Sequence, residues 1–508
     1  MTSGKVKTRL IVLLIWIVFA SIAALSLKYF FVPKIEEVKR EANVKAQKEL
    51  VESTSNHQRF TREISVYLDD FSGFLIPRTQ EFKNQLASHG IGLQIHSDPD
   101  AIARINALNS GEAQFAFFPI DSLLAASSKL GKLPASIIAL CDETKGADAI
   151  IGYKDKYPNK LDSLKTTKFV YTSNSPSEFL TKVIRTHFDL SNISTPLSLN
   201  GPKEVYEVWK NSKPSDDMAY VLYQPYVSKV LDNPNMHIIV DSSRFRGYIV
   251  DAIVVNRDLL SKDPELCLIF LESYFKALYE NKKNMVTVVR ADAAASGSPL
   301  SEKQSIESVD GIWWKNVQEN YAHMGLKSGH SLMHVEDMIN QINIVLQKSD
   351  SSYVDPTNGQ FNKLYNDTIL ASLRDKNFHP GEDEIRAEVE LKSLNDDEWK
   401  KLDPVGTLQV PDLTFTRGSS KLTSSSMDIL KNLVKNLDTW PTYYLSIIPS
   451  ATSIGSNLEA NKAKAKERAQ VVVDYLISEG VSKNRIKVSD KIELDGASVS
   501  FVLGQLPY

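Results

Sequence analysis

The stretch GEAQFAFFPIDSLLAASSKLG, residues 111–131, contains the strand-then-helix unit that decides the fold. Its first part, QFAFFPI, is a short apolar run typical of a buried strand. Its second part, DSLLAASSKLG, predicts a helix with Asp121 as the N-cap and Gly131 as the C-terminal stop. A strand that runs directly into a helix is the repeating unit of α/β proteins.

The same unit recurs on both sides of this stretch. Upstream, strands are predicted at 63–71 and 90–97, and an amphipathic helix at 100–112. Downstream, SIIALC (136–141) and ADAIIGY (147–153) read as further strands. Strands that alternate with helices in this way predict an α/β fold with a largely parallel sheet.

A second unit of the same kind begins near Ala147. It contains KFVYTSNSPSEFLTKVIRTHF (168–188), AYVLYQPYVSKVL (219–231) and HIIVD (237–241). The apolar run GYIVDAIVVNRDLL (247–260) is predicted to return toward the first unit. The chain would then form two lobes and cross between them twice. Ligands of open α/β sheets bind beyond the carboxyl ends of the strands, so a site is expected in the crevice.

Composition excludes several classes of function. With 59 basic and 62 acidic residues, the chain of 508 has a net charge of −3 and lacks the basic field expected of a nucleic-acid-binding protein. Its two cysteines, Cys141 and Cys267, are too few for a zinc cluster or a disulfide framework and are expected to be buried thiols. His323, His330 and His334 have no accompanying carboxylate pattern, so no metal and no cofactor is expected.

The N-terminus predicts a membrane anchor. Residues 10–27, LIVLLIWIVFASIAALSL, carry no charge, and to residue 32 the run has the ~20 residues that span a bilayer. Basic residues precede it, so a cytoplasmic tail (1–9), an inner-membrane span (10–32) and an exported body are expected. A cleaved signal peptide is the alternative. Residues 33–60, rich in Lys and Glu, predict a stalk helix.

The blocks LDDFSGF, GEAQFAFFPIDSLL, GADAIIGYKD and VYTSNSPSEFLTKVI, taken in order, resemble the periplasmic solute-binding proteins of the nitrate/sulfonate/taurine type. The resemblance covers about 61–377 and implies a two-lobed type II fold that closes on a small anionic or heteroaromatic ligand. A membrane-protein partner such as a permease is also implied. Carried over residue by residue, the implied ligand-binding positions are Asp69, Phe71, Phe74, Phe118, Asp121, Asp148, Thr172, Ser173, Ser175, Ser177, Tyr223, Gln224 and Tyr226.

Simpler interpretations compete at these positions. Hydroxyls before a helix favour an anion, yet a Ser-Pro helix start such as Ser175–Pro176 is more often an ordinary cap. The run FAFF is more typical of a sheet core than of a ligand wall. Gln224 replaces an acidic residue common in the family. Residues 290–310 are small and polar and predict a loop, and Trp313 and Trp314 are expected in the core or at the lobe interface.

Residues 378–404 are charged and turn-rich and predict a linker. The remaining part, 405–508, resembles the OmpA-like peptidoglycan-binding domain through LTFTRGSSKLTSSSMDIL and a helix carrying Asn461 and Arg468, the implied peptidoglycan-binding residues. The family's Gly-His-Thr-Asp is replaced by Pro449-Ser450-Ala451-Thr452, so the carboxylate that would hold an ammonium of the peptide stem is missing.

Two functions follow from these expectations. The first is a membrane-anchored periplasmic protein that binds or senses a small solute and is tethered toward the cell wall. The alternative is a structural envelope adaptor whose ligand sites are degenerate and which docks other proteins. No G-x-S-x-G elbow, P-loop or H-E-x-x-H motif is present, so the chain is not expected to be an enzyme.

Overall fold

The computed structural model describes residues 60–157, 161–188, 190, 194–328, 332–381, 384–386, 391–438, 440, 443–453, 457–494 and 498–506. The predicted anchor (10–32) and all but the last residue of the predicted stalk (33–60) lie outside these ranges. Among the residues that the structure describes, no helix combines the length and the apolar character needed to cross a membrane.

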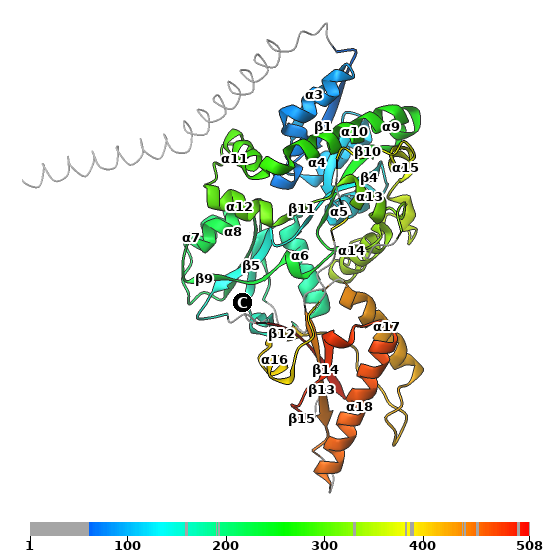
Figure 1. Ribbon diagram of the computed structural model, residues 1–508. Helices are drawn as coiled ribbons and strands as arrows, with labels where there is room; N and C mark the ends of the chain where they lie inside the picture. Colours follow the sequence, from blue (N-terminus) through cyan, green and yellow to red (C-terminus); the bar gives the residue numbers. More distant parts are fainter. Residues whose placement is uncertain are drawn as a thin grey trace, which may run out of the picture. The chain divides into compact units, whose positions relative to one another are not determined.

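The first lobe is built on a mixed sheet with the strand order β11-β4-β10-β3-β1-β2 (Figure 1). The strands are β1 (Arg62–Leu68), β2 (Ile91–Ser97), β3 (Phe115–Pro119), β4 (Ala135–Thr144), β10 (Val250–Asn256) and β11 (Ile312–Trp314). β1 and β3 are parallel, whereas β10 runs antiparallel to both β3 and β4. The accompanying helices are α3 (Gln80–Ser88), α4 (Ala101–Ser110), α5 (Ile120–Leu130), α9 (Arg257–Lys262) and α10 (Pro264–Asn281). The run 115–118 is fully buried, as expected of a sheet core.

The second lobe has the strand order β7-β6-β8-β5-β9. Its strands are β5 (Asp148–Tyr153), β6 (Lys168–Thr172), β7 (Leu197–Leu199), β8 (Met218–Tyr223) and β9 (Met236–Asp241). Its helices are α6 (Pro176–His187), α7 (Pro202–Lys210) and α8 (Tyr226–Leu231). The chain enters this lobe after β4 and returns to the first lobe in β10. The two-lobed α/β architecture with two crossings therefore agrees with the sequence-based prediction. The prediction of a largely parallel sheet is wrong, because the crossing strand β10 runs antiparallel to β3 and β4, and β5 runs antiparallel to β8 and β9.

The prediction that residues 290–310 form a loop is wrong. It forms most of two helices, α11 (Met285–Ala295) and α12 (Glu302–Asp310). The small polar residues suggested a loop, but two of them form a capping box at the start of α12. In it, the Ser301 and Gln304 side chains each accept a hydrogen bond from the other residue's backbone N–H. Helices α13 (Val317–His323), α14 (Val335–Ser349) and α15 (Thr368–Asp375) follow.

The C-terminal domain is an α+β unit. Its sheet has the order β12-β16-β13-β14, with β15 paired to β13. The strands are β12 (Asp403–Thr407), β13 (Tyr444–Ala451), β14 (Ile486–Val488), β15 (Glu493–Leu494) and β16 (Val499–Gln505), and the helices are α16 (Asp396–Lys400), α17 (Ser424–Asp438) and α18 (Leu458–Ser478). The predicted apolar stripe of α18, from Ala465 to Leu476, is buried, because α18 packs on β13.

Candidate functional site

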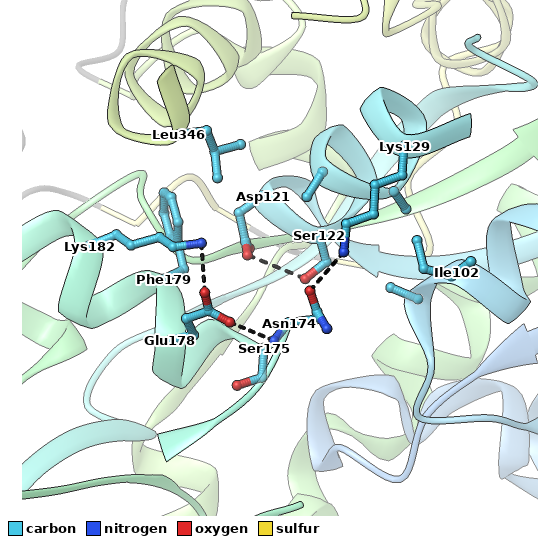
Figure 2. A pocket seen from close by; sticks show the side chains of 13 residues that line it. Ile102, Asp121, Ser122, Lys129, Asn174, Ser175, Glu178, Phe179, Lys182 and Leu346 are labelled. Atoms are coloured by element: carbon cyan, nitrogen blue, oxygen red, sulfur yellow. Dashed lines mark hydrogen bonds and ion pairs between the residues drawn. The ribbon is translucent and has the colours of Figure 1, made fainter. Parts of the chain in front are cut away.

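The candidate site lies where strand ends of the two lobes face each other. A partly open pocket with a cavity volume of about 30 Å³ is lined from the first lobe by Asp121 and Ser122 of α5, and from the second by Asn174, Glu178 and Lys182 around the start of α6. Figure 2 shows the Asp121 carboxyl between the Lys182 side chain and Ser122. Because β3 and β6 run directly into α5 and α6, both helix starts are carried to this crevice.

Asp121 does not cap its helix, which corrects the prediction from the sequence. Helix α5 begins one residue earlier, at Ile120, so Asp121 lies inside the first turn, and Pro119 occupies the N-cap position. One carboxyl oxygen accepts a hydrogen bond from the Ser122 hydroxyl at 3.3 Å, while the other is buried without a hydrogen-bond partner. Burial raises the pKa of Asp121 to about 7, although Lys182 acts in the opposite direction.

Three more buried carboxyls lie close to Asp121. Asp142 of β4 and Asp251 of β10 are direct cross-strand partners, and Asp148 begins β5. Burial raises the pKa of Asp142 to about 7 and that of Asp148 to about 8. Burial, and then the charge of Asp142, raises the pKa of Asp251 well above its ordinary value. Like charges held close together in a poorly solvated place disfavour ionisation, so the facing carboxyls Asp142 and Asp251 do not both ionise readily.

Sequence reasoning missed Asp142 and Asp251. The available signal was a single acidic residue inside each of two apolar strands, in IIALCD and GYIVDAIVV. A carboxyl is rarely fully buried without a partner, so an Asp inside a core strand indicates a special environment. What the sequence did not provide was the register that places Asp251 opposite Asp142.

The aromatic residues predicted after the first strands have different locations. Phe74 and Phe118 are fully buried in the first lobe, where Phe74 packs against Phe117. Phe71 is half-buried and meets Tyr223 of the second lobe edge-on, with 6.5 Å between ring centroids. The structure therefore brings Phe71 and Tyr223 together across the crevice and places Phe74 and Phe118 in the core.

Asp69 is already paired within the first lobe. One of its carboxylate oxygens lies 2.9 Å from a guanidinium nitrogen of Arg104, and the other accepts the Phe71 backbone N–H at 3.0 Å. The Arg104 guanidinium also lies over the ring of Phe118, 4.7 Å from its centroid. Asp69 and Arg104 thus balance each other and fix the loop that carries Phe71.

The hydroxyls around the start of α6 fall into two groups. Ser173 bonds to Ser198 at 2.6 Å, and Ser175 donates to the Thr172 carbonyl at 2.8 Å, so both are engaged locally. Thr172 and Ser177 are buried, and their hydroxyls have no hydrogen-bond partner. Ser175 occupies the N-cap position without a capping hydrogen bond from its side chain.

The residues of the segment 223–226 make different contacts. The Gln224 side-chain oxygen accepts hydrogen bonds from the backbone N–H of Ser228 at 3.3 Å and from its hydroxyl at 2.9 Å. The same Ser228 hydroxyl also contacts Glu307 of α12, so its single proton is shared between the two acceptors. Tyr226 packs against Tyr206 of α7, with ring centroids 5.7 Å apart. Gln224 and Tyr226 therefore contribute to the packing of the second lobe and α12.

Helices α11 and α12 connect the two lobes. Arg78 of the first lobe forms a two-pronged ion pair with Asp292 of α11, with both nitrogen–oxygen distances at 2.7 Å. The same guanidinium donates to the carbonyls of Asp69 and Phe71. Because Glu307 of α12 holds Ser228 in the second lobe, this helical pair bridges the crevice.

In the C-terminal domain, the two implied peptidoglycan-binding residues are engaged within the domain. Arg468 donates to the Ser419 carbonyl at 3.4 Å, and its guanidinium lies 4.8 Å from the centroid of the Phe415 ring. Asn461 donates to the Thr452 carbonyl at 3.1 Å. Arg468 is half-buried, which leaves part of the guanidinium available to a carboxylate.

Comparisons with known proteins agree with this division. Residues 414–496 match the OmpA family. The comparison with curated proteins finds no match.

Similar solved structures cover about the N-terminal 60% of the chain. They include the periplasmic aliphatic sulphonate binding protein SsuA from Escherichia coli, with 14% identity and a TM-score of 0.44 over 60% of this chain and 99% of that one. A putative sulfonate-binding SsuA from Methylobacillus flagellatus has 11% identity and a TM-score of 0.47, over 63% and 96%. The nitrate-binding protein NrtA from Synechocystis has 10% identity and a TM-score of 0.46, over 62% and 88%.

Proposed function

We propose that this chain is a non-enzymatic binding protein of the cell envelope that holds a small solute between its two lobes. The observation that carries the proposal is the set of buried polar atoms without hydrogen-bond partners on elements that meet at the crevice: Asp121, Asp142, Asp148, Thr172, Ser177 and Asp251. Buried polar groups in folded proteins nearly always have partners, so these carboxyls and hydroxyls without protein partners support a site for a polar ligand.

The remaining parts of the chain would hold this body in place. The apolar segment 10–32, preceded by basic residues, supports an inner-membrane anchor with the body exported. The match of 414–496 to the OmpA family supports a tether toward peptidoglycan. A protein anchored at one end and attached to the wall at the other would sense or deliver a solute at a fixed distance from the membrane.

A thermal-shift screen tests the solute-binding proposal. The full-length protein, purified in detergent, is melted with and without a panel of small anions, cations, zwitterions and heterocycles at millimolar concentration. A ligand that binds only the native state raises the melting temperature, by mass action. We expect at least one ligand to do so, and expect Asp121→Asn to reduce the shift. A panel without any effect would overturn the proposal.

The second candidate is the envelope adaptor, and one observation favours it. The partly open pocket of about 30 Å³ has room for only roughly two water molecules, and α11 and α12 already bridge the lobes. If the crevice is permanently closed, no solute will change the melting temperature. Hydrogen exchange at the crevice would then be equally slow with and without every solute tested.

A further inference from the structure

We propose that the solute is a compact organic cation, with a primary ammonium or guanidinium group bound at Asp121, and that it is not an anion. This inference rests on the proposed solute-binding function and names the class of solute. It is carried by three features of the crevice: the charges that line it, the state of the α6 N-terminus, and the size of the pocket.

The charge balance favours a cation. Asp121 is buried and lines the space, and one of its carboxyl oxygens has no hydrogen-bond partner, whereas Asp142, Asp148 and Asp251 are buried but do not line it. The two lysines that line the space are already engaged: Lys182 pairs with Glu178 at 2.8 Å, and the exposed Lys129 donates to the Asn174 side chain at 3.2 Å. The Asp121 acceptor is therefore unsatisfied, whereas the cations near it have partners. A buried carboxylate is stabilised when a cation pairs with it.

The anion position that the sequence predicts is already filled by the protein itself. A helix N-terminus attracts anions through its free N–H groups and its dipole. In α6 this role belongs to Glu178 in the first turn, whose carboxylate accepts the Asn174 backbone N–H at 2.7 Å. A nitrate or sulfonate entering the space would meet this carboxylate and Asp121 (Figure 2). A cation would meet these two carboxylates and the Ser122 hydroxyl, beside Lys182, which is paired with Glu178, and Lys129, which is bonded to Asn174.

The size of the space limits the bound group. About 30 Å³ is room for roughly two water molecules, which matches the volume of an ammonium or amidine-like headgroup better than that of a large ring. Three N–H donors of an ammonium fit a site made of unsatisfied acceptors. A longer organic part of the solute would extend toward the half-buried Phe71 and Tyr223 only after the lobes separate.

The test uses the full-length protein in detergent and four probes: methylammonium, guanidinium, nitrate and methanesulfonate, all at matched ionic strength. We expect the cations to raise the melting temperature and the anions to have no effect. Asp121→Asn, which keeps size and removes charge, should weaken cation binding about tenfold or more, since a charged hydrogen bond is lost. The matched control is Asp258→Asn, which removes an exposed carboxylate from α9 and should change nothing.

Proton exchange gives a second, independent readout. The groups that act on Asp121 are Lys182, Glu178 and Lys129 around the space, and Asp148 and Asp251 behind it. A cation that binds ionised Asp121 must displace the proton that burial keeps there near pH 7. Calorimetry of the strongest cation at pH 6.5, in two buffers of different ionisation heat, should therefore show proton release. Asp121→Asn should abolish that release.

The outcomes separate the two proposals. If nitrate or methanesulfonate raises the melting temperature and neither cation does, the cation inference is overturned and solute binding stands. If none of the four probes nor the wider panel has an effect, both are overturned. Equal cation binding by Asp121→Asn and Asp258→Asn would also overturn the site. Should Asp121→Asn fail to fold, Ser122→Ala, which removes the hydroxyl that lines the space, serves as the second variant and should also weaken cation binding.

Discussion

The Lys315 ammonium lies 2.6 Å from a carboxylate oxygen of Glu143, and both side chains are buried. Glu143 and Asp142 are consecutive residues of β4, and consecutive strand residues point to opposite faces of a sheet. Burial alone would raise the pKa of Glu143, but Lys315, together with Arg246 and the Gly247 backbone N–H, outweighs it and holds that pKa below its ordinary value. Asp142, without such a partner, has its pKa raised. Strand β4 thus carries, on opposite faces, Glu143 with a buried cationic partner and Asp142 without one.

Replacing Lys315 by Met should destabilise the protein strongly. The change removes the ion-pair partner of the buried Glu143 carboxylate, and breaking a buried pair in this way costs roughly 3–5 kcal/mol in the free energy of unfolding. Urea denaturation of the full-length protein, followed by tryptophan fluorescence, measures the loss in the free energy of unfolding. The control is Lys262→Met in an exposed pair with Asp258, expected to change stability by less than about 0.5 kcal/mol. Equal effects of the two substitutions would contradict the importance of the buried pair.

Stability without solute should fall as the pH rises from about 4 to about 8. The folded-state pKa values of Asp142 (about 7) and Asp148 (about 8) lie above the unfolded value near ~3.9, so the native state holds protons that the unfolded chain has released. The cost of ionising Asp142 and Asp148 in the folded protein is therefore absent below pH 4, grows between pH 4 and pH 8, and levels off above pH 8. Asp148→Asn should flatten the slope and stabilise the protein at pH 8 by ~1–3 kcal/mol. Melting temperatures measured between pH 5 and 8.5 test this, and an unchanged slope would refute it.

Breaking the ion pair between Arg78 and Asp292 should loosen the bridge between the lobes. Asp292→Ala removes two charge-assisted hydrogen bonds of 2.7 Å, and we expect a loss of about 1–3 kcal/mol. Amide hydrogen exchange in 69–74 and in α11 should become faster, because Arg78 also holds the carbonyls of Asp69 and Phe71. Glu272→Ala, in a within-helix pair with Lys276, is the control and should leave both segments unchanged. Unaltered exchange in Asp292→Ala would show that the bridge does not depend on this pair.

Restoring the missing carboxylate should strengthen peptidoglycan binding. Thr452 stands three residues before Gly455, the place where the family pattern has its Asp. Thr452→Asp supplies an anionic partner for an ammonium of the peptide stem, worth ~1–3 kcal/mol, whereas Arg468→Ala removes the guanidinium. Sedimentation with isolated peptidoglycan should rank Thr452→Asp above the native protein and Arg468→Ala below it. If none of the three proteins pellets, wall binding by this domain is wrong.

The parts of the fold that could be predicted from the sequence were those with a local pattern of apolar residues. The alternation of apolar strands and amphipathic helices predicted both lobes, and the apolar stripe of α18 predicted its buried face. The segment 290–310 failed because its helices depend on a capping box and on packing rather than on an apolar stripe. The N-cap prediction for Asp121 failed because the helix starts one residue earlier than the apolar pattern suggests.

By itself, the sequence determined which residues are apolar at strand and helix spacing, and hence two α/β lobes and a separate C-terminal α+β domain. It also placed Asp121 and Asp148 among the candidates. Only the tertiary structure decided that Asp142 and Asp251 join them, because cross-strand register brings together residues 109 positions apart. Charge in a crevice depends on distances between elements and on removal from water, and neither quantity is encoded in local periodicity.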